Sequence, residues 1–388
     1  MSEPITLSLP RILLSADSNI PPSGGGREDG THSKIPEAIQ RVLNCLNEEI
    51  PDYREINLAI EEAIKPLKKR CRNFADSATS AQQRTRLADV VHKLDSEEIG
   101  RADEFLVYDE YFGVTRSAIF TPVDLETHLT FTATRALEDI QHSVLGVDEL
   151  SSVINSMKLM LEYCDGISAS QRNAEGALLG PNAPLNSIAL PPPVRSSEYR
   201  WRIGHHFFAF ATQFCRHFLV AVARNDTSAP PDEIAGLIRK AHICLRGTTA
   251  AMWHAANMSR HSYQKTIRPS MVNKGGDGFS GTQHLDYERL KQAREAAIQW
   301  LEANFGSVPS RWPSAVRTEF RDYCEAEVED LEHHTLIAAS KVGRTTSLLQ
   351  DATHPAKKGD QVPGVGLTAV DHLRSMAKQR RAKLSKFL

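Results

Sequence analysis

The sequence predicts an all-α protein, and three observations support this fold class. Apolar residues recur at the three- and four-residue spacing of amphipathic helices through most of the chain. No segment alternates convincingly between apolar and polar residues as a strand does, and no repeat of fixed period is present. Pro/Gly-rich stretches are few, and they separate long helical segments. A length of 388 residues favours two domains or one large one.

The N-terminal part combines a mobile leader with a smaller helical domain, residues 36–198. Residues 1–35 contain PPSGGGREDGTHS, which cannot bury a core, so we expect a mobile segment. Apolar residues at helical spacing then run from Ile35 to Cys71. Two more helices are expected over Asp124–His142 and Val147–Tyr163, the second with Asp148 as its N-cap. Residues 166–198 read as a linker or long crossing loop because they are rich in Pro, Gly and Ser.

The second domain, residues 199–388, is expected to be the larger helical bundle. Phe207–Ala223 is apolar on most faces and predicts a buried helix. The remaining expected elements are a helix from Pro230 to Asn257, a Gly-rich loop over 269–284, helices over Leu285–Phe305 and Ala315–Val342, a loop over 343–367, and a last helix over Thr368–Leu388.

Charge and composition exclude several functional classes. The chain has 46 basic and 48 acidic side chains, so it lacks the positive field that nucleic-acid binding requires. No apolar run reaches the roughly 18 residues of a membrane span, and the N-terminus lacks the pattern of a secretory signal. The six cysteines form no CxxC pair, which suits free thiols in a reducing compartment. These observations predict a cytoplasmic protein.

The segment Asp330-Leu-Glu-His-His334-Thr-Leu-Ile-Ala338 carries the sharpest candidate site. His334 shares a helical face with Leu331 and Ala338. Its imidazole therefore projects from an apolar face, and the residue one turn later on that face, Ala338, is small. Imidazole ligates haem iron, and a flat macrocycle can approach a helix closely beside alanine. The alternative is a packed core or surface histidine. A di-iron site is a further alternative, because Asp139-x-x-His142 and Asp330-x-x-His333 are two carboxylate–histidine pairs on long helices.

Arg268 is the second candidate, in the segment Tyr263-Gln-Lys-Thr-Ile-Arg268-Pro269. The proline is expected to stop the helix and leave Arg268 at its C-terminal end, facing a loop. There the guanidinium can hold a carboxylate, or it can simply complement the helix dipole. The glycines of 275–281 suit a substrate lid or a plain loop, and they do not form a nucleotide-binding motif.

Taken in order, five segments resemble the haem-dependent superfamily of indoleamine and tryptophan 2,3-dioxygenases, with the indoleamine branch closest. They are Arg202-Ile-Gly-His-His-Phe207-Phe208-Ala-Phe210-Ala211, Tyr263-Gln-Lys-Thr-Ile-Arg268-Pro269, Phe279-Ser280-Gly281-Thr282-Gln283, Leu331-Glu-His-His334 through Gly343, and Gly364-Val-Gly366-Leu-Thr368 with the helix after it. The resemblance covers roughly residues 199–380.

The resemblance implies an oxygenase that binds haem b through His334, with Ala338 and Gly343 beside the cofactor. It places Arg268 on the substrate carboxylate, with further substrate contacts from Tyr263, Phe207, Phe210, Ala211, Ser280, Gly281 and Thr368. The implied partners are O₂, an external reductant and a small amino acid. The leading reaction is opening of the tryptophan indole ring to N-formylkynurenine.

Departures from the family pattern keep a second reaction open. Ala211 stands where the dioxygenases carry serine, and the Gly-Thr-Gly-Gly-Thr motif is here Gly-Val-Gly-Leu-Thr368. These changes fall on substrate contacts, so the alternative is a monooxygenase or N-oxygenase acting on another amino acid in a biosynthetic pathway. A non-catalytic helical interaction module is the alternative from another class. The sequence leaves the oligomeric state open.

Overall fold

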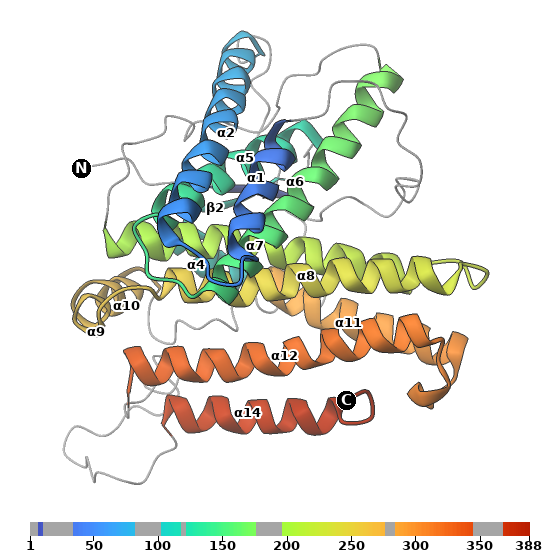
Figure 1. The fold of residues 1–388 in the computed structure, drawn as a ribbon. Helices are drawn as coiled ribbons and strands as arrows, with labels where there is room; N and C mark the ends of the chain where they lie inside the picture. Colours follow the sequence, from blue (N-terminus) through green and yellow to red (C-terminus); the bar gives the residue numbers. More distant parts are fainter. Residues whose placement is uncertain are drawn as a thin grey trace, which may run out of the picture.

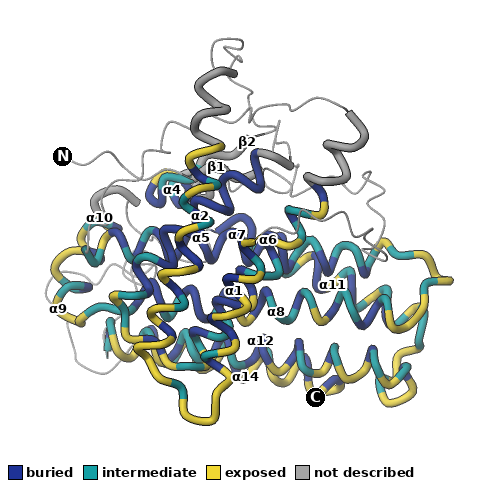
Figure 2. Tube along the Cα trace, turned by 45° about the horizontal axis from the view of Figure 1, so that its top comes forward, coloured by how far each residue is buried: buried dark blue, intermediate teal, exposed yellow. Residues whose placement is uncertain are grey.

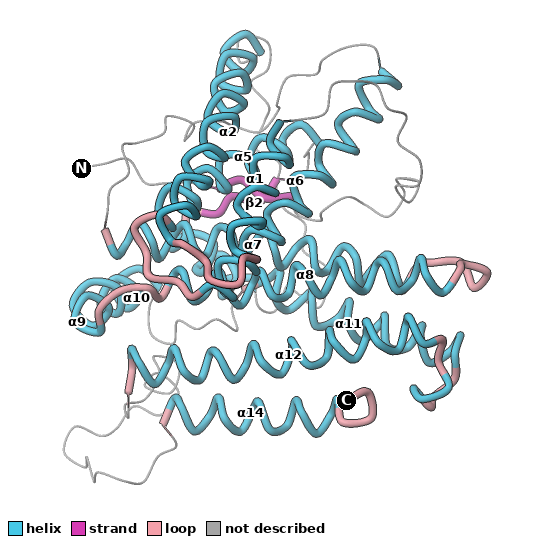
Figure 3. The backbone as a smooth tube through the Cα atoms, in the orientation of Figure 1, coloured by secondary structure: helices cyan, strands magenta, loops and turns pink. Residues whose placement is uncertain are grey.

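The computed structural model describes residues 7–10, 34–81, 102–117, 122–175, 196–275, 284–343 and 368–388. These residues are nearly all helical, which confirms the all-α prediction (Figure 3). The helices are α1 (Lys34–Leu46), α2 (Tyr53–Ala81), α4 (Ala102–Phe112), α5 (Pro122–Ile140), α6 (Val147–Glu175), α7 (Ser197–Ala223), α8 (Pro231–Ala255), α9 (Arg260–Ser262), the π-helix η1 (Tyr263–Ile267), α10 (Arg268–Gly275), α11 (Leu285–Phe305), the 3₁₀ turn η3 (Pro309–Arg311), α12 (Ser314–Lys341) and α14 (Ala369–Leu384).

One short parallel ladder interrupts the helices, so the expectation of no strands was wrong at two places. Strand β1 (Leu7–Pro10) pairs with β2 (Val114–Ser117), and Leu7 lies opposite Val114. Parallel strands need a long crossover connection, and here more than a hundred residues separate them. Pattern analysis of a four-residue segment cannot reveal a partner so far away in the chain. Strand β1 lies inside the segment that we expected to be mobile.

The helices form three groups, with α7 and α8 between the other two (Figure 1). The N-terminal helices α1, α2, α5 and α6 pack on one side of this pair, and α11, α12 and α14 pack on the other. The start of α7, the end of α8, helices α9 and α10, the end of α12 and the start of α14 all gather at one end of the molecule, on the left in Figure 1. No helix within the described ranges is long and apolar enough to cross a membrane.

Helix boundaries differ from expectation around the predicted linker. Helix α6 continues to Glu175, and α7 begins at Ser197 after an N-cap in which Ser196 accepts a hydrogen bond from the backbone N–H of Tyr199 at 3.1 Å. The linker expected over 166–198 is therefore helical at its start, while residues 176–195 lie outside the described residues. The division into two domains stays a prediction.

One large apolar cluster, here called the main core, extends from α1 to α14 and includes residues from both expected domains. Helices α5 and α7 lie deepest in it and are buried almost all round (Figure 2). All six cysteines are free; Cys164, Cys215, Cys244 and Cys324 belong to the main core, Cys45 packs against it, and Cys71 contacts Thr134 of α5.

Candidate functional site

The inward face of α12 changes character along its length. From Val316 to Leu331 its residues at helical spacing are buried, among them Phe320 and Tyr323 at 1 % exposure. From His334 onward the cover is incomplete: His334, Ile337, Ala338 and Lys341 are half-buried, while Thr335 and Val342 are still buried. A helix face that is apolar yet incompletely covered is a candidate ligand site.

His334 is the functional group of this half-open face. Its side chain is 31 % exposed, and its Nδ1 lies 3.1 Å from the backbone oxygen of Asp330. A carbonyl oxygen only accepts, so Nδ1 carries the hydrogen and the lone pair of the neutral ring is on Nε2. Within the described residues, Nε2 has no hydrogen-bond partner. This arrangement, one nitrogen held by the protein and the other open, is typical of a metal-binding histidine.

A buried carboxylate supports the His334 ring. Asp330 is 3 % exposed, and its Oδ2 lies 3.7 Å from His334 Nδ1. Its Oδ1 accepts a hydrogen bond from the Thr249 hydroxyl of α8 at 2.6 Å. Thr249 therefore fixes the carboxylate, and the carboxylate lies beside the N–H of the imidazole. Such outer contacts orient a ligand histidine and raise its basicity.

The neighbouring His333 has a different role. Its ring packs edge-on against Trp253 of α8 at 5.7 Å between centroids, and its Nδ1 is buried without a hydrogen-bond partner. His333 therefore lies between α12 and α8. The structure thus distinguishes the two adjacent histidines and favours His334 as a ligand.

A second apolar cluster lies at the same end of the molecule and is here called the end cluster. Its members are Tyr108, Tyr111, Phe112, Trp201, Ala255, Tyr263, Ile267, Met271, Val342 and Ala369. Three polar or aromatic residues extend it. His205 stacks on Phe112 at 4.0 Å, His284 meets Tyr108 edge-on at 4.8 Å, and Phe208 meets His284 at 5.1 Å. Aromatic rings from four separate segments therefore line this end.

Tyr263 and Arg268 belong to this region, although their helix differs from expectation. The chain does not stop before Pro269: residues 263–267 form a π-helix, and α10 then continues from Arg268 to Gly275. Proline is tolerated there because the first turn of a helix leaves its backbone N–H groups unpaired. Part of the loop expected over 269–284 is thus helical. π-Helical turns are frequent at functional sites.

The charge of Arg268 acts on the Tyr263 hydroxyl. Burial raises the pKa of Tyr263, while the nearby charge of Arg268 acts in the opposite direction. Tyr263 is 8 % exposed, and its ring meets Trp201 at 6.0 Å. The two residues expected to contact substrate therefore lie together beside the end cluster.

Three other predicted substrate contacts lie elsewhere on α7. Phe207, Phe210 and Ala211 are at most 1 % exposed and belong to the main core. The stripe of α7 that reaches the end cluster instead carries Trp201, His205 and Phe208. The helical period explains this, since neighbouring residues point about 100° apart and His205 and Phe207 cannot share a face.

The remaining predicted residues have identifiable structural roles or fall outside the described residues. Thr368 is the N-cap of α14, and its hydroxyl and Asp371 form a capping box. Gly343 ends α12 with φ of +74°, and a Cβ there would lie 2.7 Å from the Arg260 guanidinium. The positive φ favours glycine at this position, whereas the Arg260 guanidinium, at the end of a flexible side chain, could move aside. Ser280 and Gly281 lie outside the described residues.

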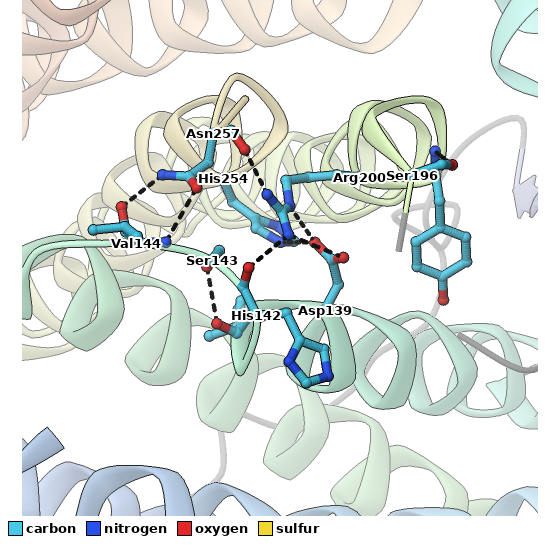
Figure 4. Close-up of polar contacts among 10 residues, drawn as sticks. Asp139, His142, Ser143, Val144, Ser196, Arg200, His254 and Asn257 are labelled. Carbon is cyan, nitrogen blue, oxygen red and sulfur yellow. Dashed lines mark hydrogen bonds and ion pairs between the residues drawn. The ribbon is translucent and has the colours of Figure 1, made fainter. Parts of the chain in front are cut away.

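A buried polar cluster fixes the start of α7 (Figure 4). Asp139 of α5 accepts hydrogen bonds from Arg200 Nε at 2.7 Å and from His254 Nε2 at 2.8 Å. Arg200 also donates to the backbone oxygens of Asn257 and His142. Burial alone would raise the pKa of Asp139, but the hydrogen bonds from His254 and Arg200 outweigh it and lower that pKa. The cluster joins α5, α7 and α8 directly beside Trp201.

This cluster also weakens the di-iron alternative. The carboxylate of Asp139 is engaged by Arg200 and His254, and that of Asp330 by Thr249. Among the described residues no group of three or more His, Cys, Asp or Glu side chains could hold a metal ion. A haem iron needs only one protein ligand, which His334 can provide.

The residues at this end fit a haem. His334 offers an open Nε2, and Ala338, one turn further along α12, is a small residue that leaves room beside it. The aromatic end cluster, which includes Val342 of the same helix, supplies rings suited to a flat apolar macrocycle. A surface cleft of about 320 Å³ opens nearby at the ends of α8 and α12, but its lining residues are Trp253, residues 256–259 and Lys341, and His334 is not among them. The sequence interpretation did not include five further residues that gather at this end and are candidates for the site: Tyr108, Phe112, Trp201, His205 and His284. The i, i+4 spacing of Trp201 and His205 was the available signal.

Comparison with known protein families decides the assignment. The model of the SfmD 3-methyl-L-tyrosine peroxygenase family matches residues 42–315, well over half of the chain. The chain belongs to this family. It is a family of haem-dependent oxygenases related to the tryptophan and indoleamine dioxygenases, so the expectation of a haem oxygenase is confirmed at this level. No curated protein and no solved structure matches the chain.

The family match sharpens two expectations. It supports the wider superfamily but not the indoleamine branch, and it favours the monooxygenase alternative over dioxygenation of tryptophan. The matched residues include His205, Arg268 and His284 but end before His334. The assignment of His334 therefore depends on the geometry of α12 and on the resemblance of its own segment.

Proposed function

We propose that the chain binds haem b through His334 Nε2 and uses a peroxide to place one oxygen atom on the ring of a tyrosine-like amino acid. The observation that carries the proposal is the His334 imidazole, with Nδ1 held by Asp330 and Nε2 open on the half-covered face of α12. The family match supports the reaction class, since its printed name is that of a peroxygenase acting on 3-methyl-L-tyrosine. When bound, haem supplies the redox chemistry that divides an O–O bond.

The residues around His334 have separate roles in this proposal. The Asp330 backbone oxygen holds the N–H of the imidazole, and Thr249 fixes the Asp330 carboxylate beside the ring. Arg268 holds the substrate carboxylate, a charge-assisted interaction worth roughly 1.5–3 kcal/mol. Tyr263 and Trp201 supply apolar walls that exclude water from the reacting atoms. Ser280 and Gly281 stay predictions as further substrate contacts.

The cysteine positions favour a haem held by coordination alone. A thioether link requires a cysteine at the edge of the macrocycle. All six cysteines are in or against the main core or beside Thr134, and none belongs to the end cluster. We therefore propose haem b.

The decisive experiment is reconstitution with hemin followed by a visible spectrum and a pyridine haemochrome assay. The wild-type protein is expected to show a Soret band that is lost in His334→Ala and kept in the matched control His333→Ala. Loss of the band in His333→Ala alone would move the ligand by one residue. A protein that stays colourless under all conditions would favour the non-catalytic helical module instead.

The reaction is tested by mass analysis of products from tyrosine, 3-methyltyrosine and tryptophan. With isotopically labelled hydrogen peroxide, we expect one labelled oxygen atom in a tyrosine-type product. Two oxygen atoms in a tryptophan product, formed from O₂ and a reductant, would instead support ring-opening dioxygenation. In Arg268→Ala the haem is expected to remain while amino-acid binding weakens at least tenfold, and Arg268→Lys should recover little because lysine lacks the planar fork.

A further inference from the structure

The cleft at the ends of α8 and α12 borders the helix face that carries His334. Its volume is about 320 Å³, and it is lined by Trp253, residues 256–259 and Lys341. Lys341 follows His334 by seven residues. It therefore lies about 10 Å further along the helix axis, on nearly the same face. His333, next to His334, contacts the Trp253 ring at 5.7 Å between centroids. Two lining residues thus connect the cleft to the candidate haem site.

Lys341 is a half-buried cation without an acidic partner. Its Nζ donates a hydrogen bond to the backbone oxygen of Met258 at 2.5 Å, and no carboxylate among the described residues pairs with it. Burial lowers the pKa of Lys341, and no nearby acid counteracts this effect. An ammonium group has three N–H donors, so the Met258 contact leaves two of them for a ligand. A partly buried cation without a counter-charge favours the binding of an anion.

Trp253 supplies a second unsatisfied donor. Its indole Nε1 is buried and has no hydrogen-bond partner in the part of the chain that the structure describes. An indole N–H only donates, and a buried donor without an acceptor is uncommon and costs free energy. Because Trp253 lines the cleft, a ligand there can bring the missing acceptor.

The other polar side chains of the cleft lining are already engaged. The Asn257 amide exchanges two hydrogen bonds with the backbone of Val144, at 3.1 Å and 2.6 Å (Figure 4). The Ser259 hydroxyl accepts from the backbone N–H of Ser262 at 3.0 Å and caps the next helical turn. The two remaining polar side chains of the lining are therefore both donors, and one of them is positively charged. A carboxylate is the ligand group that matches such a set.

We propose that this cleft receives a propionate of the haem and that Lys341 Nζ donates to its carboxylate. This inference rests on the proposed function. Haem b carries its two propionates at one edge of the macrocycle. His334 and Lys341 share a helix face, so a macrocycle ligated by the first can present that edge to the second. Arg260, whose guanidinium lies beside Gly343 at the end of α12, is a second cation at this place. Such a contact sets the rotation of the macrocycle about the bond between iron and histidine.

A purely structural role for Lys341 is the alternative. A cation in the last turn of a helix complements the helix dipole. The same helix end is also held by Gln264, whose Nε2 donates to the backbone oxygen of Lys341 at 2.6 Å. A structural lysine would affect the binding of every iron porphyrin equally, whereas a propionate partner distinguishes a charged porphyrin edge from a neutral one.

The test compares hemin with its dimethyl ester, in which both propionates are neutral. Dissociation constants are measured by absorbance titration for full-length wild type, Lys341→Met and the matched control Lys265→Met. Lys265 is exposed on η1 and does not line the cleft, so the control loses the same charge near the same end of the molecule. We expect Lys341→Met to bind hemin about 10- to 100-fold more weakly than wild type, the range for a charge-assisted hydrogen bond. Its affinity for the ester is expected to change less than about threefold, and Lys265→Met should bind both porphyrins as wild type does.

Resonance Raman spectroscopy of the bound hemin gives a readout that a change in protein stability does not move. The propionate bending band responds to hydrogen bonds on the carboxylates. It is expected to shift in Lys341→Met, to return towards the wild-type position in Lys341→Arg, and to stay unchanged in Lys265→Met. Equal weakening of hemin and ester binding in Lys341→Met would assign the lysine a structural role and overturn the proposal. Unchanged hemin affinity with an unchanged band would overturn it as well.

The wild-type titrations separate this inference from the function on which it rests. If the wild type binds hemin and its ester equally well, the propionate role is wrong while the proposed function stands. If it binds neither, the proposed function fails and this inference falls with it. Should Lys341→Met not fold, Lys341→Gln replaces it, because glutamine keeps a donor for the Met258 oxygen but no charge. A variant that keeps the preference for hemin over the ester but loses affinity for tyrosine would place the substrate carboxylate in the cleft and overturn the proposal.

Discussion

The two halves of α12 have the same helical geometry but different surroundings. In the first half the inward face carries Phe320, Tyr323 and Cys324, which are at most 1 % exposed, and the helix packs against α8 and α14. In the second half the same face carries His334 and Ala338 and stays half-open. Burial of apolar surface within the protein stabilises the fold. Apolar surface that stays exposed can be buried by a ligand and so contributes to binding instead. The difference teaches that a residue's place along one helix can decide whether it serves stability or binding.

The largest expected effect concerns three buried imidazoles outside α12, one on α5 and two on α7. Burial lowers the pKa of His128 to about 4 and those of His205 and His206 to about 3. The unfolded chain protonates these groups near pH 6.5, whereas the folded protein keeps them neutral, so folding stability falls as pH drops below that value. Between pH 7 and pH 5 we expect a loss of about 6 kcal/mol, roughly 2 kcal/mol per histidine.

Urea denaturation at the two pH values measures this loss. In His206→Gln the difference between pH 7 and pH 5 is expected to shrink by about a third, because one of the three titrating groups is gone. Equal unfolding free energies of the wild type at both pH values would mean that these histidines are not held neutral in the folded protein.

A direct contrast between the two halves comes from matched truncations to alanine. Phe320→Ala removes a ring that is 1 % exposed and is expected to cost 3–5 kcal/mol of unfolding free energy, the usual range for buried phenylalanine. Ile337→Ala, on the half-open part, is expected to cost about 1 kcal/mol or less, because little of its neighbourhood is packed. Denaturant unfolding at pH 7 measures both. Similar costs would show that the second half is as well packed as the first.

The polar cluster at the start of α7 is expected to contribute almost as much to the unfolding free energy as the buried Phe320 ring does. Asp139→Asn leaves Arg200 and His254 buried without their counter-charge, and breaking a buried pair in this way costs about 3 kcal/mol or more. The control is Glu162→Gln, which loses an exposed pair with Lys158 and is expected to cost under about 0.5 kcal/mol. Because the folded-state pKa of Asp139 is lowered, its contribution is present above about pH 4 and disappears as pH falls further. An Asp139→Asn protein as stable as wild type would assign the cluster no stabilising role.

Much of the fold could be predicted from the sequence, because helix signals are local. Residues 285–305 were predicted as a helix with the bounds of α11, and α12 differs by one residue at each end. The π-turn at Tyr263 and the pairing of β1 with β2 could not be predicted, because both depend on tertiary contacts. The proline after Arg268 is also ambiguous, because proline occurs both just after the end of a helix and in the first turn of a new one.

The candidate site could be predicted from the sequence only where a residue's contacts come from its own helix. His334 has its inward face and its Nδ1 contact from the α12 backbone four residues earlier, which the sequence contains. The choice between Phe207 and Phe208 as a site residue depends on how α7 is rotated against its neighbours. That rotation is fixed by contacts such as the close approach of Gly204 to Ala255. The rotation places Phe208, not Phe207, beside His284.

The smallest expected change in stability is predicted for Ala338→Phe, a substitution that should also abolish hemin binding. Ala338→Phe adds a large ring to the half-open face, where there is room, so the unfolding free energy is expected to change by less than about 0.5 kcal/mol. The same ring would occupy the surface that a macrocycle needs beside His334, and hemin uptake should fall below detection. Ala326→Phe, on the covered half at 4 % exposure, is expected to cost 1–3 kcal/mol by overpacking while haem uptake survives. Unfolding curves and hemin titrations on both proteins would show whether the two halves of α12 separate stability from binding. An Ala338→Phe protein that still binds hemin with wild-type affinity would place the cofactor elsewhere.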